Sequence, residues 1–122
     1  TYHDPCYLGR YNGEVDAPRR LLDRLGIERR EMERSGKRSM CCGGGGGAPV
    51  SDIEGERRIP DIRMAQASAT GAGIVAVACP QCSAMLEGVT GARPAVHDIA
   101  ELVLMAVEKA GSAPARKAEA LI

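Results

Sequence analysis

The placement of its cysteines limits what this 122-residue chain can fold into more than any other feature does. Five cysteines fall into three groups, separated by 34 and 36 residues: Cys6, the adjacent pair Cys41-Cys42, and Cys79-x-x-Cys82. Adjacent cysteines cannot form an unstrained disulfide, and an odd total leaves a thiol without a partner, so a disulfide framework fits poorly. Reduced thiols in such numbers suit a soft metal ion or an iron–sulfur cluster. A fold that holds such a centre must bring three distant segments to one place.

Composition favours a small α/β domain. The chain contains no Phe and no Trp, so its core must be built from aliphatic residues and Met, as in the buried strands of a parallel sheet. Its length suffices to bury a core without covalent cross-links. Sixteen basic and sixteen acidic residues give a net charge of zero. This balance argues against nucleic acid as a partner and against an anionic membrane surface.

Nothing in the sequence predicts a membrane span or a secretion signal. No apolar run approaches the ~18 residues that a transmembrane helix needs, and the first residues do not resemble a signal peptide. We expect a cytoplasmic chain with reduced thiols, which a parent protein could hold at the inner face of the membrane. The chain begins with Thr1 rather than Met, and we expect one domain of a longer polypeptide.

Strand patterns recur along the chain. The clearest is residues 73–78, an uninterrupted apolar run of the kind that is buried on both faces. Residues 95–97 form a candidate short strand, and residues 1–6 have strand-like character. Residues 27–33 are weakly strand-like and would complete a βαβ unit with the first strand. We therefore predict a small, mainly parallel sheet flanked by helices.

Capping residues, apolar spacing and helix breakers predict helices in the intervals. These are residues 17–25 between Asp16 as N-cap and Gly26 as stop, a helix opened by the capping box Ser51–Glu54 and interrupted at Pro60, residues 61–70, residues 81–87 before Gly88, and a helix from 99 to about 111 after the capping pair Asp98 and Glu101. Residues 9–16 are predicted to be a loop. We expect residues 1–110 to form the domain and residues 111–122 a C-terminal tail.

The cysteines fall where ligands bind to such a fold. Ligands of an open parallel sheet bind beyond the carboxyl ends of its strands. Cys6 and Cys79 come just after predicted strands, and the double cysteine follows the third candidate strand after a few residues. Pro80 suits the first turn of a helix, so Cys79 lies near the N-cap and Cys82 in the first turn. The free amides and dipole of that turn favour thiolates, which are the metal-binding form.

Five successive glycines, residues 43–47, follow the double cysteine. Residues without Cβ let the backbone approach a cluster and donate N–H groups to it, so we expect Gly43, Gly44 and Gly45 to line the site. The alternative is a flexible low-complexity linker. A phosphate-binding loop is improbable because no Lys-Ser or Lys-Thr follows the glycines.

The ordered motifs Cys6, Cys41-Cys42-Gly43 and Cys79-Pro80-Gln81-Cys82 resemble the cysteine-rich CCG domain of the heterodisulfide reductase family, that of its B-type subunits and related iron–sulfur oxidoreductases. The resemblance covers roughly residues 1–110. Further segments are most similar to the branch associated with electron-transfer flavoprotein or acyl-CoA dehydrogenase systems: His3–Arg10, Asp16–Arg19, Met32–Arg34 and Cys41–Gly47.

The resemblance implies that all five cysteines ligate a four-iron cluster (4Fe-4S), of non-cubane type in heterodisulfide reductase. Other members of the family hold a simpler iron–sulfur cluster or zinc. Such domains occur in pairs, within proteins that also carry ferredoxin-type domains. The implied function is electron transfer between a flavoprotein donor and a quinone, a disulfide or another acceptor.

Two other interpretations of the cysteines compete with a cluster. Four thiolates would satisfy tetrahedral Zn²⁺, which would give a structural or interaction domain without redox turnover. A thioredoxin-like dithiol at Cys79 and Cys82 is less consistent, because it leaves the other three cysteines unexplained.

Three polar residues complete the candidates. His3 is a possible ligand or proton donor, although a polar residue at a strand end is the simpler interpretation. Arg10 could counter the negative charge of a thiolate-bound cluster. His97 is most simply a strand-terminal residue.

Overall fold

The computed structural model describes residues 1–44 and 58–111. Its sheet contains β1 (Ile74–Val77) and β2 (Ala95–Asp98), paired in parallel with Ile74 opposite Ala95 and Val77 opposite Asp98. The first residues of the chain lie along the other edge of β1, where Tyr2 forms a parallel bridge with Ala76. These three parallel segments confirm the predicted small parallel sheet of an α/β fold.

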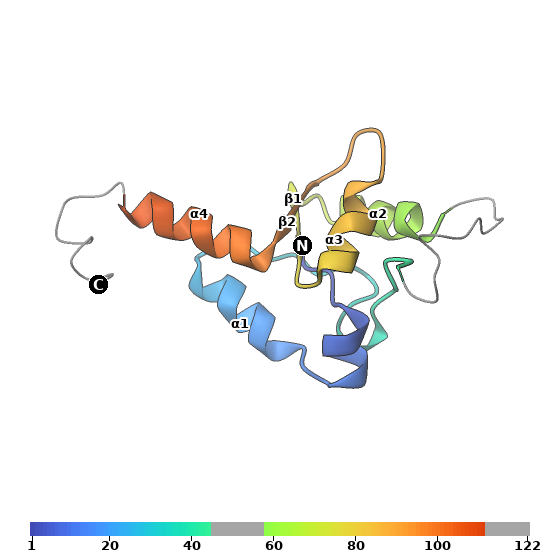
Figure 1. The fold of residues 1–122 in the computed structure, drawn as a ribbon, viewed down its shortest axis with the longest axis horizontal. Helices are drawn as coiled ribbons and strands as arrows, with labels where there is room; N and C mark the ends of the chain where they lie inside the picture. Colours follow the sequence, from blue (N-terminus) through green and yellow to red (C-terminus); the bar gives the residue numbers. More distant parts are fainter. Residues whose placement is uncertain (45–57, 112–122) are drawn as a thin grey trace.

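Helices cover both faces of the sheet (Figure 1). Val75 and Val77 point to one face, where they pack with residues of α2 (Ile59–Ala69) and α3 (Pro80–Glu87). Ala76 points to the other face, toward α1 (Asp16–Arg24) and α4 (Ile99–Gly111). Successive strand residues alternate between faces, and each face is covered, so the strand is apolar throughout. The prediction of a strand buried on both sides is confirmed.

The elements that follow β1 agree with the local signals of the sequence. Helix α2 begins at Ile59 with Pro60 in its first turn, and α3 begins after Cys79 with Pro80 in its first turn. Pro is tolerated there because the first amides of a helix have no partner within the helix. Helix α4 follows β2 directly, and Gly88 caps the end of α3 as predicted.

The predicted loop over residues 9–16 is wrong at its start. Residues Cys6–Tyr11 form η1, a single π-helical turn in which the Asn12 amide donates to the carbonyl of Tyr7 at 3.1 Å. The rings of Tyr7 and Tyr11 lie 5.2 Å apart on this turn. A turn this short has no apolar repeat to announce it, and neighbouring segments must hold it in place.

The predicted N-cap of α1 is also wrong. Asp16 already belongs to the helix, and the cap residue Val15 has no side-chain bond to offer. The Glu14 carboxylate instead accepts the Ala17 amide at 2.7 Å, because its longer side chain reaches the helix from outside. The predicted stop is confirmed, since Gly26 has a φ of +74°, a left-handed conformation that favours glycine.

Residues 27–33 do not form the weak strand that we predicted. Their charged side chains form ion pairs, with Arg29 bonded to Asp23 at 3.1 Å and to Glu31 at 3.2 Å. The edge of β1 that such a strand would need is taken by residues 1–3. A short 3-10 turn, η2 (Gly36–Arg38), leads from here to the double cysteine.

Some predictions lie outside the described residues: the capping box Ser51–Glu54, Gly45 and residues 112–122 of the tail. Within residues 1–44 and 58–111, no helix has both the length and the apolarity to cross a bilayer.

Candidate metal centre

Three buried side chains from distant parts of the chain converge at the carboxyl edge of the sheet. The possible ligand atoms of His3, Cys42 and Cys82 all lie within 4.8 Å of one another, and each residue is at most 5% exposed. His3 belongs to the N-terminal segment beside β1, Cys42 to the loop after η2, and Cys82 to the first turn of α3. The structure thus brings these three predicted candidates together.

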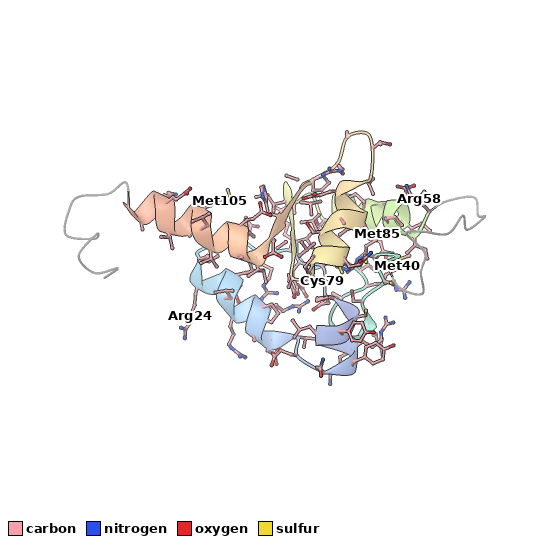
Figure 2. The ribbon with its side chains drawn as sticks, in the orientation of Figure 1. Arg24, Met40, Arg58, Cys79, Met85 and Met105 are labelled. Atoms are coloured by element: carbon pink, nitrogen blue, oxygen red, sulfur yellow. The ribbon has the colours of Figure 1, made fainter. Side chains whose placement is uncertain are left out.

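Cys79 stands where β1 gives way to α3 (Figure 2). Its backbone is extended, with φ −151° and ψ 128°, and it makes no side-chain capping bond to the helix. The thiol is half-buried and lies within hydrogen-bonding reach of Cys82. A fourth candidate ligand therefore adjoins the central group.

Two glycines allow the double-cysteine loop to approach the helices. Gly43 has a φ of +91°, and a Cβ there would lie 3.0 Å from Cδ of Pro60 and 3.1 Å from Cβ of Ile59. A Cβ on Gly44 would lie 2.6 Å from Cγ of Gln81, between the two cysteines of α3. Only residues without a side chain permit these approaches. The loop thus lies directly against the start of α3.

Other candidates lie outside the central group. Cys41 and Cys6 are half-buried, and within the described residues their sulfur atoms are not part of the 4.8 Å group. The Cys41 sulfur accepts the Gly43 amide at 3.2 Å. The exposed Arg10 donates a hydrogen bond to the carbonyl of Ser39, and His97 pairs with Glu101 at 3.2 Å on α4.

The two buried thiols share a proton unequally. A hydrogen bond from Cys82 lowers the pKa of the Cys42 thiol, and hydrogen bonds from His3 and the Gly44 amide lower it further, against the opposing effect of burial. The bond to Cys42 and the burial of the site raise the pKa of Cys82. Cys42 is therefore the thiolate of the metal-free pair. A bound metal would replace the shared proton, since both sulfurs must be deprotonated to ligate.

Arg63 of α2 also belongs to this site, although it was not among the residues predicted from the sequence. Its guanidinium is fully buried, and its Nε donates to Nδ1 of His3 at 2.9 Å. A signal for it existed in the sequence. Residues 60, 63, 64 and 67 recur at helical spacing and form the buried side of α2, and the second of them is an arginine. A charged residue in an otherwise apolar stripe indicates a buried partner.

Asp4 was missed as well. It is 2% exposed, and its carboxylate accepts bonds from Arg19 at 2.6 and 2.7 Å and from the Gly36 amide at 2.7 Å. This buried ion pair ties the residue after His3 to α1 and η2. It therefore holds the N-terminal segment, and His3 with it, in place.

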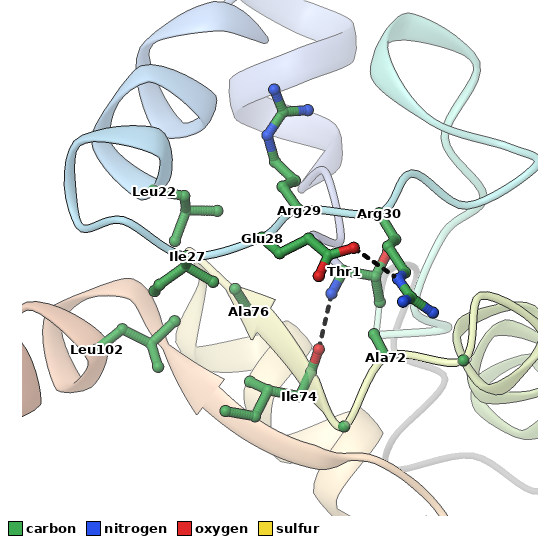
Figure 3. Close-up of a pocket in the computed structure, with 12 residues that line it drawn as sticks. Thr1, Leu22, Ile27, Glu28, Arg29, Arg30, Ala72, Ile74, Ala76 and Leu102 are labelled. Carbon is green, nitrogen blue, oxygen red and sulfur yellow. Dashed lines mark hydrogen bonds and ion pairs between the residues drawn. The ribbon is translucent and has the colours of Figure 1, made fainter.

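A pocket of about 310 Å³ lies elsewhere, at the amino end of β1 (Figure 3). Leu22, Ile27, Ile74 and Leu102 line it, and the amino group of Thr1 donates to the carbonyl of Ile74 at 2.8 Å there. None of the lining residues is a cysteine. Since the thiols gather beyond the other end of β1, this hollow is not part of the candidate centre.

Comparison with known proteins supplies independent information about this thiol site. Residues 1–87 match a family model described as "CCG: Cysteine-rich domain". No solved structure matches the chain.

Three relatives illustrate the range of similar proteins. A "Probable membrane-anchored ferredoxin" of Chromohalobacter salexigens is 60% identical over 88% of this chain and 17% of its own length. One subunit of the dihydromethanophenazine:CoB–CoM heterodisulfide reductase of Methanosarcina barkeri is 39% identical over 88% of this chain and 27% of its own length. "EtfAB:quinone oxidoreductase" of Syntrophomonas wolfei is 36% identical over 88% of this chain and 17% of its own length.

Other relatives are named as an iron–sulfur-binding oxidoreductase and an iron–sulfur subunit. The relatives are thus iron–sulfur and redox proteins, and the chain spans 17% to 27% of the length of the three described above.

Proposed function

The chain belongs to the family of CCG cysteine-rich domains found in heterodisulfide reductases and related iron–sulfur oxidoreductases, and from this membership we propose that it is an iron–sulfur electron-transfer module of a larger oxidoreductase. The observation that carries the proposal is the buried convergence of Cys42, Cys82 and His3, with Cys79 adjoining them. Buried thiols from segments 40 positions apart in sequence have no need to meet in a core that aliphatic residues could fill.

The residues present fit such a cluster. The donors are predominantly soft thiols, which iron–sulfur clusters require. The backbone at Gly43 and Gly44 comes closer to α2 and α3 than any side chain would allow. A fully buried guanidinium stands behind His3, where it can balance the charge of several thiolates. These three features are independent of the family match.

We assign Cys6, Cys41, Cys42, Cys79 and Cys82 as the ligands. When bound, the cluster would supply reversible one-electron storage. The protein would fix the sulfurs, exclude water through the buried thiols of Cys42 and Cys82, and donate N–H groups from the glycine turn. Hydrogen bonds to the sulfurs and burial set the reduction potential of such a centre.

The finer points of the proposal follow the names of the relatives. A four-iron cluster, non-cubane in form, would accept electrons from a flavoprotein and pass them to a quinone or a disulfide. The parent protein would supply a second CCG domain or a ferredoxin-type domain. It would also supply any membrane attachment, as the name of one relative suggests.

A zinc domain without redox turnover is the second candidate, and one observation favours it. Cys42, Cys82 and Cys79 with His3 supply three sulfurs and one nitrogen, a common tetrahedral set for structural Zn²⁺. Cys6 and Cys41 would then have no role as ligands.

Metal analysis and spectroscopy of anaerobically purified protein separate the two candidates. We expect iron and acid-labile sulfide, visible absorption, and a paramagnetic signal in one oxidation state. Alanine substitution of the surface residue His97 is the control and should leave the iron content unchanged. A colourless protein with about one zinc per chain, the content of one tetrahedral site, and no paramagnetic signal would overturn the electron-transfer proposal.

A further inference from the structure

Two buried arginines of this chain differ in their partners. Arg19 faces carboxylates, with Asp4 at 2.6 Å and Glu31 at 2.9 Å. Arg63 is 0% exposed, and the described residues give it only neutral acceptors: Nδ1 of His3 at 2.9 Å, the carbonyl of Arg34 at 2.7 Å, Oε1 of Gln66 at 2.8 Å and Oγ of Ser39 at 3.0 Å. Hydrogen bonds satisfy this guanidinium, but no carboxylate in the described residues neutralises it.

A buried cation without a counter-charge is unfavourable. Asp4 is the nearest carboxylate to influence Arg63, but both of its oxygens are already bonded, to Arg19 and to the Gly36 amide. Burial lowers the pKa of Arg63 to about 10, while Asp4, Cys82 and Cys42 oppose this effect. Arg63 thus stays charged at neutral pH, and the thiols of the centre are the anionic groups left to balance it.

The bond between Arg63 and His3 also fixes the imidazole. A guanidinium has only donors, so Nδ1 of His3 must be the acceptor in the 2.9 Å contact. The single ring proton then resides on Nε2, which is the only donor the ring has left. The hydrogen bond from His3 to the Cys42 sulfur must come from this Nε2–H. A nitrogen that carries a proton is not free to ligate a metal.

We propose that Arg63 is the positioning residue of the metal centre: it holds His3 as an N–H donor to the Cys42 sulfur, so that His3 is not a ligand, and it places a positive charge behind the thiolates. The inference rests on the proposed metal centre. Reduction adds negative charge to the centre, and both the N–H donor and the guanidinium favour that state. The pair therefore raises the reduction potential.

The first test reads the imidazole directly and needs no metal. In the metal-free, reduced full polypeptide with ¹⁵N-labelled histidine, a long-range ¹H–¹⁵N correlation distinguishes protonated from unprotonated ring nitrogens. We expect His3 with a proton on Nε2 and none on Nδ1, and Arg63→Gln should weaken this preference. His97 is the internal control and should not change. A His3 protonated at Nδ1 would overturn the inference whatever metal the protein holds.

The second test asks whether His3 is bonded to the metal in the loaded protein. Pulsed electron paramagnetic resonance of the iron-loaded protein with ¹⁵N-histidine should show only the weak coupling of a hydrogen-bonded nitrogen. A strong coupling, of the kind given by a directly bound nitrogen, would overturn the inference. His3→Gln keeps an N–H donor and should retain the iron, whereas loss of iron from this variant would mean that His3 is a ligand.

The third test measures the midpoint potential of the iron-loaded protein by optical redox titration. Arg63→Lys keeps the charge and should shift the potential little, while Arg63→Gln removes the charge and should lower it. Arg58→Gln removes an exposed charge beside the start of α2 and serves as the matched control (Figure 2). Equal potentials for wild type and a folded, iron-loaded Arg63→Gln would overturn the inference. A wild type without iron would refute the proposed function, yet the first test would still decide the arrangement of Arg63 and His3.

Discussion

Two strand-to-helix junctions lie side by side at the carboxyl edge of the sheet, and they begin their helices differently. Val77, near the end of β1, lies opposite Asp98 at the end of β2. After β2, the Asp98 carboxylate accepts the Ala100 amide at 2.8 Å, and Glu101 accepts the Asp98 amide at 3.2 Å. This reciprocal capping box satisfies the start of α4.

The junction after β1 forgoes such a cap. Cys79 occupies the N-cap of α3 and makes no side-chain bond to the helix. Ser or Asp at that position would stabilise the helix by about 1 kcal/mol. The start of α3 instead presents free amides and thiols toward the centre, where the helix dipole favours thiolates. One junction is thus arranged for helix stability, and its neighbour keeps its helix terminus available for a ligand.

Cys79→Ser tests this contrast with the largest expected effect. The variant should lose most of its bound iron, because a proposed ligand is gone. The metal-free form should become more stable by about 0.5–1 kcal/mol, because Ser is a good N-cap. Iron analysis and urea unfolding of the metal-free protein measure the two effects. Full iron retention in this variant would remove Cys79 from the ligand set and erase the distinction between the junctions.

Gly44→Ala sharpens the comparison, since only the β1–α3 junction supports the double-cysteine loop. The new Cβ would lie 2.6 Å from Cγ of Gln81, and we expect a loss of about 1–2 kcal/mol by overpacking together with weaker iron retention. Adding Gln81→Ala should restore both. Gly73→Ala, where a new Cβ meets nothing within 4 Å, is the control. An unrescued double variant would show that the loop is placed by other contacts.

Asp98→Ala tests the other junction. Loss of the cap should destabilise the protein by about 1 kcal/mol, because the Ala100 amide loses its acceptor. The iron content should not change, since Asp98 lies outside the thiol group. Thermal or urea unfolding measures the first expectation and metal analysis the second. A large loss of iron would mean that the two junctions are coupled.

Glu101→Gln should have the smallest effect, visible in the pH dependence of stability. The Asp98 amide, followed by His97, lowers the pKa of Glu101 below its ordinary value of 4.5. A lowered pKa in the folded state means that the carboxylate stabilises the protein above pH 4.5, and this contribution is lost as the pH falls through the folded pKa. The variant should lose that part of the acid dependence in unfolding curves recorded below pH 5, and an unchanged curve would contradict the expectation.

Local signals in the sequence made both junctions predictable. The apolar run that forms β1, the prolines in the first turns of α2 and α3, and the pair Asp98 and Glu101 act through backbone groups within a few residues. Stretches without such signals were predicted wrongly. Residues 27–33 have weak strand character, and what decides their structure is a set of ion pairs that includes the contact from Arg29 to Asp23.

The sequence by itself determined the identity of the thiol donors, the α/β alternation and the family. Only the tertiary structure decided which groups meet: Cys42 with Cys82, 40 positions along the chain, and His3 with Arg63, 60 positions along. The physical reason is that capping and periodicity depend on neighbours in the chain, whereas the state of a buried charge or imidazole depends on which distant groups replace its water.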